Sequence, residues 1–135
     1  MQQIEFSWKT KSGLNLYAKE WKPEGKVKAV VALVHGLGEH IGRYDHVAEA
    51  FGKAGFAMVG FDQRGHGRSE GIRGYETSYD AIMDDISQNI QNAKDVFQAL
   101  ASQGPYFFKR APANSATAPS VVCAAFNPSE KSLSE

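Results

Sequence analysis

The sequence predicts an α/β fold in which the strands of a mainly parallel sheet alternate with helices. Residues 27–34 and 57–61 are short, nearly continuous apolar runs, the pattern of strands covered on both faces. Helical periodicity follows each run, and glycine-rich polar stretches separate the elements. Strands and helices alternating in this order favour parallel strands joined by right-handed crossovers.

An antiparallel hairpin is expected before the first buried strand. Residues 4–10 and 14–21 flank the short polar segment 11–13, and apolar side chains alternate with polar ones along the second of them. Residues 27–34 then predict a central strand of the sheet. The first helix follows because Tyr44, Val47, Ala48 and Phe51 occur at helical spacing, and Gly55 is a suitable stop.

A second, longer helix is expected over residues 78–103, after a strand at 57–61 and a loop at 62–74. Its apolar residues recur every three or four positions, which predicts one face packed on the sheet. Thr77 and Asp80 have a spacing similar to a capping box at its start. Gly104 and Pro105 end it, and Tyr106 begins a further strand.

The chain changes character after residue 104. All 13 glycines lie between Gly13 and Gly104, whereas four of the five prolines follow that point. The end of the chain is rich in Ala, Ser and Pro and has weak periodicity. We therefore divide the chain into a folded part, residues 1–108, and a tail, residues 109–135, expected to be disordered or read from a shifted frame.

Composition narrows the classes of partner. Fifteen Lys and Arg balance fifteen Asp and Glu, so no nucleic-acid-binding surface is indicated and a small-molecule partner is favoured. The single cysteine, Cys123, and the absence of a signal-peptide pattern predict a reducing, cytoplasmic setting. The longest wholly apolar run has six residues, so no membrane span is expected.

The loop after residue 34, here called the first loop, carries the first pattern that indicates chemistry. It reads His35, Gly36, Leu37, Gly38, Glu39, His40. In an open α/β sheet, ligands bind outside the carboxyl ends of the strands. Two glycines around Leu37 allow a sharp turn that leaves the Leu37 amide free, and a free amide there can stabilise an oxyanion. The alternative is an ordinary glycine-rich connection.

Residues 62–74, here called the second loop, follow the next buried strand and favour a structural interpretation. Asp62 and Ser69 are expected to accept hydrogen bonds from neighbouring backbone amides, and the glycines permit tight turns.

Together, WKPEGKVKAVVALVHGLGEHIGRYDHVAEAF and FDQRGHGRSEGIRG resemble the monoacylglycerol lipase and lysophospholipase branch of the α/β-hydrolase fold. The resemblance covers residues 3–108 and implies an incomplete α/β-hydrolase sheet. It further implies a serine hydrolase of lipid acyl esters, with the Leu37 amide as one oxyanion donor. The residues implied to shape the two loops are His35, Gly36, Gly38, Glu39, His40, Gly65, His66 and Gly67.

The nucleophile of this family is absent from the sequence. The family places it in a G-x-S-x-G turn after the strand that Tyr106 begins, with an acid and a histidine later in the chain. Alignment puts Arg110 and Pro112 where the first Gly and the Ser would stand. Ser115 and Ser120 lack the glycines that such a turn needs, so neither is expected to be a nucleophile. We therefore expect no esterase activity from these residues alone.

No metal or cofactor is expected. The four histidines, His35, His40, His46 and His66, form no known ligand pattern with carboxylates. A central strand left near an open sheet edge would favour self-association through that edge.

Three interpretations stay open. The chain is the amino-terminal part of a lipase-like hydrolase, shortened by a frameshift, a premature stop or gene fragmentation. It is, alternatively, a non-catalytic remnant that binds an acyl ligand or a protein. As a third possibility, a separate chain supplies the missing half.

Overall fold

The computed structural model describes residues 1–100, 107–110 and 123–126 of the chain. In chain order its elements are β1 (Gln2–Lys9), β2 (Asn15–Lys22), β3 (Ala29–Val34), η1 (Ile41–Tyr44), α1 (Asp45–Lys53), β4 (Phe56–Phe61), α2 (Tyr79–Leu100), β5 (Phe107–Arg110) and β6 (Cys123–Phe126). The predicted hairpin, both buried strands and both helices are confirmed, and the predicted end of the second helix at residues 101–105 lies outside the described residues. The short helix η1 was not predicted.

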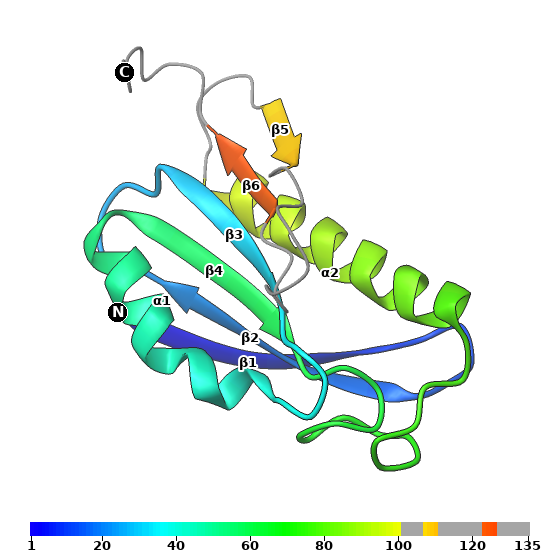
Figure 1. The fold of residues 1–135 in the computed structure, drawn as a ribbon. Coiled ribbons are helices and arrows are strands. Elements are labelled where there is room, and N and C mark those ends of the chain that lie inside the picture. Colours follow the sequence, from blue (N-terminus) through cyan, green and yellow to red (C-terminus); the bar gives the residue numbers. More distant parts are fainter. Residues whose placement is uncertain (101–106, 111–122, 127–135) are drawn as a thin grey trace.

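The described strands form one sheet in the order β1-β2-β4-β3-β6-β5 (Figure 1). β3 and β4 are parallel, with Ala29 opposite Phe56 and Val34 opposite Phe61. The other neighbouring strands are antiparallel. The sheet is thus mixed, and the parallel arrangement expected from the sequence is realised in β3 and β4.

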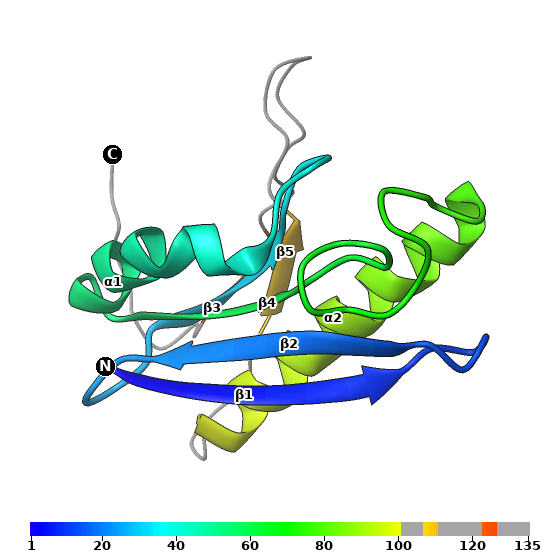
Figure 2. The same cartoon turned by 90° about the horizontal axis from the view of Figure 1, so that it is seen from below.

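Helices cover both faces of the sheet, α1 on one side and α2 on the other (Figure 2). Because side chains alternate along a strand, Val30 and Ala32 face α2 and pack with Phe97, while Val31 and Leu33 face α1. All six residues of β3 are buried, as its apolar sequence predicts. Neither helix among the described residues has the length and apolar character needed to span a bilayer.

The ends of the helices depend on local hydrogen bonds. α1 stops before Gly55, whose φ of 88° is the left-handed conformation expected of a helix stop. At the start of α2, the Ser78 hydroxyl accepts the Ala81 amide hydrogen at an N···O distance of 3.2 Å. The prediction that Thr77 caps this helix is therefore wrong. The Thr77 hydroxyl instead accepts a hydrogen bond from Arg64, at 3.4 Å.

The strand order beyond β3 also differs from expectation. The family resemblance implies that the strand beginning at Tyr106 lies beside β3. Instead, β6 takes that position and pairs antiparallel with residues 29–32, and β5 pairs with β6. An exposed strand edge carries unpaired N–H and C=O groups, which a paired segment satisfies. Of the tail expected to be disordered, residues 109–110 and 123–126 lie in these strands, and the remainder lies outside the described residues.

The second loop extends the sheet without forming a strand. β4 pairs with β2 only over residues 18–21. Earlier in β2, the Tyr17 amide donates to the Ser69 hydroxyl at 2.9 Å, and the Asn15 amide donates to the Glu70 carboxylate at 2.7 Å. The Glu70 amide returns a hydrogen bond to the Asn15 carbonyl at 3.0 Å. These contacts fix the second loop against the hairpin.

Candidate active site

The first and second loops meet at the carboxyl ends of β3 and β4. Because the two strands are parallel neighbours, both loops leave the sheet at the same edge. The Gln63 amide donates to Nε2 of His35 at 2.9 Å, and the Gln63 side-chain amide donates to the His35 carbonyl at 2.6 Å. His35 and Gln63 thus join the two loops.

His35 is a neutral structural link. Its side chain is buried, and burial lowers its pKa, with desolvation the largest cause. Nδ1 lies 2.8 Å from the Gly36 carbonyl oxygen, and Nε2 accepts the Gln63 amide hydrogen. This pattern assigns the proton to Nδ1. Since both nitrogens are engaged, His35 has no free site to act as a general base.

The first loop turns sharply around Leu37 and Gly38. The Glu39 amide donates to the Gly36 carbonyl at 3.2 Å, and Gly38 has a φ of 74°, as the third residue of a type II turn requires. The Leu37 side chain is 85% exposed. Among the described residues, no acceptor receives a hydrogen bond from the Leu37 amide. The turn therefore leaves the Leu37 N–H available to a ligand.

The Glu39 carboxylate holds this turn in place. Its Oε2 accepts the Gly36 amide hydrogen at 3.0 Å and the Tyr44 hydroxyl hydrogen at 2.7 Å. Arg43 lies 3.4 Å from Oε1. The hydrogen bonds from Tyr44 and Gly36 lower the pKa of Glu39. Glu39 was predicted to shape the loop, whereas Tyr44 had been assigned only to the apolar face of a helix.

Asp62 is the buried centre of the second loop. One carboxylate oxygen accepts the Ile41 amide hydrogen at 2.7 Å, and the other accepts the Arg68 amide hydrogen at 2.8 Å. The Ser69 hydroxyl donates to the Asp62 carbonyl oxygen. The predicted backbone hydrogen bonds of Asp62 and Ser69 are present. They reach further than expected, because Ile41 follows the first loop and Tyr17, which donates to Ser69, lies in the hairpin.

Two glycines of the second loop have no room for a side chain. A Cβ at Gly67 would collide with the Asp62 carboxylate, and one at Gly65 would collide with the Ile72 carbonyl oxygen. Both residues have positive φ, 71° at Gly65 and 48° at Gly67. Between them, His66 is buried, with Nδ1 3.0 Å from the Arg64 carbonyl oxygen.

A buried ion pair between Arg64 and Asp85 was missed from the sequence. The Nε and Nη2 atoms of Arg64 lie 2.8 and 2.9 Å from the two carboxylate oxygens of Asp85, with both side chains buried. The Arg64–Asp85 ion pair connects the second loop to α2. One signal could have revealed it, because Asp85 and Asn89 fall on the otherwise apolar face of α2 near Ile82 and Ile86.

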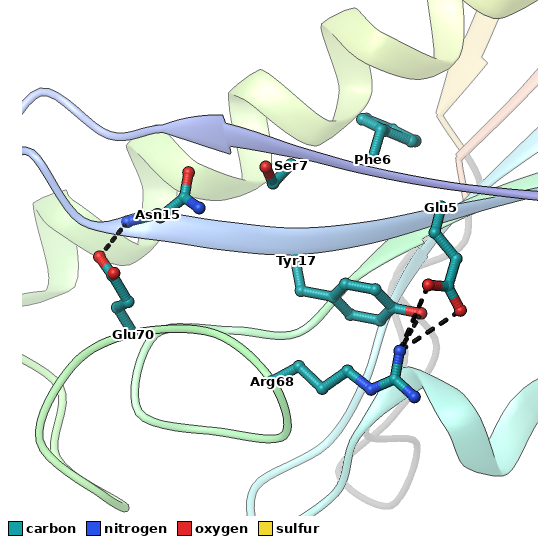
Figure 3. A pocket seen from close by; sticks show the side chains of 7 residues that line it. All are labelled: Glu5, Phe6, Ser7, Asn15, Tyr17, Arg68 and Glu70. Atoms are coloured by element: carbon teal, nitrogen blue, oxygen red, sulfur yellow. Dashed lines mark hydrogen bonds and ion pairs between the residues drawn. The ribbon is translucent and has the colours of Figure 1, made fainter.

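A polar hollow of about 390 Å³ lies between the hairpin and the second loop (Figure 3). Arg68 stacks on the Tyr17 ring at 4.9 Å and contacts Glu5 at 3.3 Å. Burial and the hydrogen bond with Glu5 raise the pKa of Tyr17 to about 12. Glu5 and Arg68 pair with each other, and the Glu70 carboxylate accepts the Asn15 amide hydrogen, so we assign this hollow no chemistry. Its lining residues are Glu5, Phe6, Ser7, Asn15, Tyr17, Arg68 and Glu70.

Among the described residues, the remaining candidates contribute no catalytic group to this edge. Ser115 and Ser120 lie outside the described residues, and His40 and His46 are exposed. Within the described ranges, no group of three His, Cys, Asp or Glu side chains could hold a metal ion. The described part of the site consists of the free Leu37 amide, on a turn that Glu39 holds in place, next to the second loop.

Comparison with known proteins identifies the family. The sequence profile of the family described as serine aminopeptidase, S33 matches residues 25–108, which include β3, both loops and α2. This chain belongs to that family. Its fold is the α/β-hydrolase fold, and its relatives include monoglyceride lipases.

Three relatives show how far this family resemblance extends. The monoacylglycerol lipase of Mycolicibacterium smegmatis is 35% identical over 101 residues, 75% of this chain and 34% of that protein. The monoglyceride lipase of Rattus norvegicus is 34% identical over 82 residues, 61% of this chain and 27% of that protein. A thermostable carboxyl esterase from Bacillus coagulans superposes with a TM-score of 0.56 and 25% identity, covering 78% of this chain and 34% of that one. The chain thus spans between about a quarter and a third of the length of these three relatives.

Proposed function

We propose that this chain provides the oxyanion-binding loop of a serine hydrolase that cleaves carboxylic esters, with the Leu37 amide as one donor. One observation carries the proposal: in the first loop the Glu39 carboxylate accepts the Gly36 amide hydrogen, whereas the Leu37 amide donates to no described acceptor. In acyl transfer, a fixed donor of this kind stabilises the negative charge that develops on the carbonyl oxygen.

The proposal assigns the attacking group to residues outside this sequence. The 135 residues contain no G-x-S-x-G turn, and the amide after the missing serine would be the second donor. The chain alone therefore lacks a nucleophile and part of the oxyanion site. We expect it to release no p-nitrophenol from p-nitrophenyl butyrate and to resist labelling by a fluorophosphonate probe. A burst of product or a labelled band would contradict this assignment.

A chimaera tests the role of the Leu37 amide. Residues 1–108 would replace the matching part of the M. smegmatis monoacylglycerol lipase, of which the match covers 34%. Leu37→Pro removes the amide hydrogen at the second residue of the turn, a position that suits proline. We expect kcat to fall about 10²- to 10³-fold. Leu37→Ala keeps the amide and is the matched control, with kcat close to that of the chimaera. Equal kcat values for the two variants would refute the role of the amide.

A second candidate is non-catalytic binding of an acyl ligand, favoured by exposed apolar side chains near the two loops. Leu37, Ile72 and Tyr79 are 85%, 72% and 74% exposed. Large exposed apolar side chains of this kind are candidates for contact with an apolar ligand. Titration of the chain with a fluorescent fatty acid tests this candidate. Saturable binding that Ile72→Ser weakens would favour it, and no binding at micromolar concentrations would exclude it.

A further inference from the structure

β1 forms one rim of the sheet and has no strand on its outer side among the described residues. It comes first in the strand order, and Figure 2 shows it as the outermost strand, with the carboxyl end of α2 emerging beyond it in this view. All eight of its residues pair with β2 on the inner side. A long unpaired edge can accept a strand from another chain unless charges or bulges prevent it.

The hydrogen bonds of β2 reveal which backbone groups of β1 point outward. The amides of Asn15 and Tyr17 donate to the second loop, on the side of β2 away from β1. Their partners in the register are Lys9 and Ser7, and these pairs are therefore the non-hydrogen-bonded ones of the antiparallel ladder. By the same alternation, the outward N–H and C=O groups of β1 belong to its odd-numbered residues, Gln3, Glu5, Ser7 and Lys9.

The side chains of β1 also divide between two faces. Phe6 and Trp8 are half-buried on the α2 side, with ring centroids 6.3 Å apart, and pack near Ile86 of α2. Glu5 and Lys9 lie on the opposite face and are exposed. Lys9 forms no ion pair with a described residue, whereas Glu5 contacts Arg68 through an exposed pair at 3.3 Å.

We propose that β1 pairs antiparallel with β1 of a second copy of this chain, across a twofold axis at Ser7. In this register Glu5 of each copy lies opposite Lys9 of the other, and Phe6 lies opposite Trp8. The outward N–H and C=O groups of Glu5, Ser7 and Lys9 form the new ladder. The seam joins the two sheets, and it is independent of the proposed hydrolase function.

Charge selects this register over its neighbours. A twofold axis perpendicular to the sheet keeps each side chain on its own face, so residues on the same face must lie opposite one another. A register centred on Glu5 or on Lys9 places like charges opposite, which is destabilising. A register centred on Phe6 or Trp8 separates Glu5 from Lys9. Only the register centred on Ser7 gives two opposite-charge pairs and two aromatic pairs.

The seam is short, so association should be weak. A stable interface buries about 800 Å² on each partner, more than one strand pair supplies. We therefore expect a dimer that forms reversibly as the concentration of the chain rises. Sedimentation equilibrium of the full chain, from about 1 to about 500 μM, would show the molar mass rising from one copy toward two.

A charge exchange tests the register. Lys9→Glu places acidic side chains opposite one another and should shift dimerisation to at least about tenfold higher concentration, a loss of about 1.4 kcal/mol. The double variant Glu5→Lys with Lys9→Glu restores opposite charges and should restore dimerisation. Circular dichroism checks that each variant keeps its fold. A monomer at all concentrations, or dimerisation unaffected by Lys9→Glu, would overturn the proposal.

A cross-link tests the position of the axis. In a Cys123→Ser background, Ser7→Cys places the two thiols opposite each other at the axis, about 5.5 Å apart between Cα atoms, within disulfide range. Gln3→Cys is the matched control on the same strand and face, where the two thiols would be about 26 Å apart along the seam. Mild oxidation should cross-link the first variant and leave the second unlinked. Equal cross-linking of both would overturn the assigned register.

Discussion

The first and second loops leave neighbouring parallel strands at the same edge of the sheet, yet they are held in different ways. The first loop has one carboxylate, Glu39, that holds a turn whose Leu37 side chain is 85% exposed. The second loop is held by the buried Asp62 carboxylate, a buried ion pair and glycines without room for a Cβ. The Asp62 carboxylate of the second loop also binds the amide of Ile41, which follows the first loop. The second loop therefore helps to hold the first loop, in which the Leu37 amide stays free.

The largest effect is expected from breaking the ion pair between Arg64 and Asp85, which connects the second loop to α2. Asp85→Ala leaves the Arg64 guanidinium buried without its partner, and should destabilise the fold by about 3–5 kcal/mol. Replacing both residues, with Arg64→Met and Asp85→Leu, removes the buried charges together and should recover most of that loss. Urea unfolding of the three proteins measures both effects. A double variant no more stable than Asp85→Ala would show that the pair does more than neutralise charge.

Glycine substitutions compare the two loops directly. Gly67→Ala forces a Cβ onto the Asp62 carboxylate and disturbs the hydrogen bonds to Ile41 and Arg68, so we expect a loss of about 2–4 kcal/mol. Gly38→Ala, in the first loop, has a similar positive φ but open space around the new Cβ. It should cost only about 1 kcal/mol. Equal losses in chemical denaturation would show that the two loops are equally packed.

Asp62→Asn tests the hydrogen bonds that connect the two loops and changes the side chain less than the glycine substitutions do. One of the two acceptor oxygens becomes an NH₂ group facing a backbone N–H, and the expected loss is about 1–3 kcal/mol. Asp95→Asn, at an exposed position of α2, is the control and should be nearly neutral. Differential scanning calorimetry checks the difference in melting temperature. Similar values for both variants would contradict a central role for Asp62.

The smallest expected effect concerns Glu39 and depends on pH. Its pKa is lower in the folded chain than its ordinary value of 4.5, because the carboxylate accepts hydrogen bonds from Tyr44 and Gly36. Its contribution to stability is therefore fully present above about pH 4.5 and is lost as the pH falls through the lower folded value. The stability difference between the parent chain and Glu39→Gln should shrink between pH 6 and pH 3. Glu49→Gln, in an exposed helical ion pair, is the control, and a difference independent of pH would contradict this reasoning.

Local patterns predicted the elements of the fold, because strands and helices depend on the spacing of apolar residues. The burial of β3 and the stop of α1 at Gly55 follow directly from such spacing. Contacts between distant residues do not follow from spacing. Arg64 and Asp85 are 21 positions apart, and the Ser69 hydroxyl meets the Tyr17 amide 52 positions earlier. No period in the sequence encodes such pairs.

The predicted site shows the same division. Glycines around Leu37 indicated a sharp turn, and the turn is present. The partners that hold it, Tyr44 and Arg43, come from η1, which has no sequence signal of its own. β6 was missed for a related reason, since four residues are too few for a recognisable strand period.

The second loop takes the place of a neighbouring strand along the first part of β2. This arrangement affects how readily the start of β2 unfolds locally. The amides of Asn15 and Tyr17 are held by Glu70 and Ser69, so their hydrogen-exchange protection depends on a segment more than 50 positions away. A nick by a protease between Gly67 and Gly71 should therefore speed deuterium uptake at the start of β2. The hairpin tip and the second loop would then open as one cooperative unit.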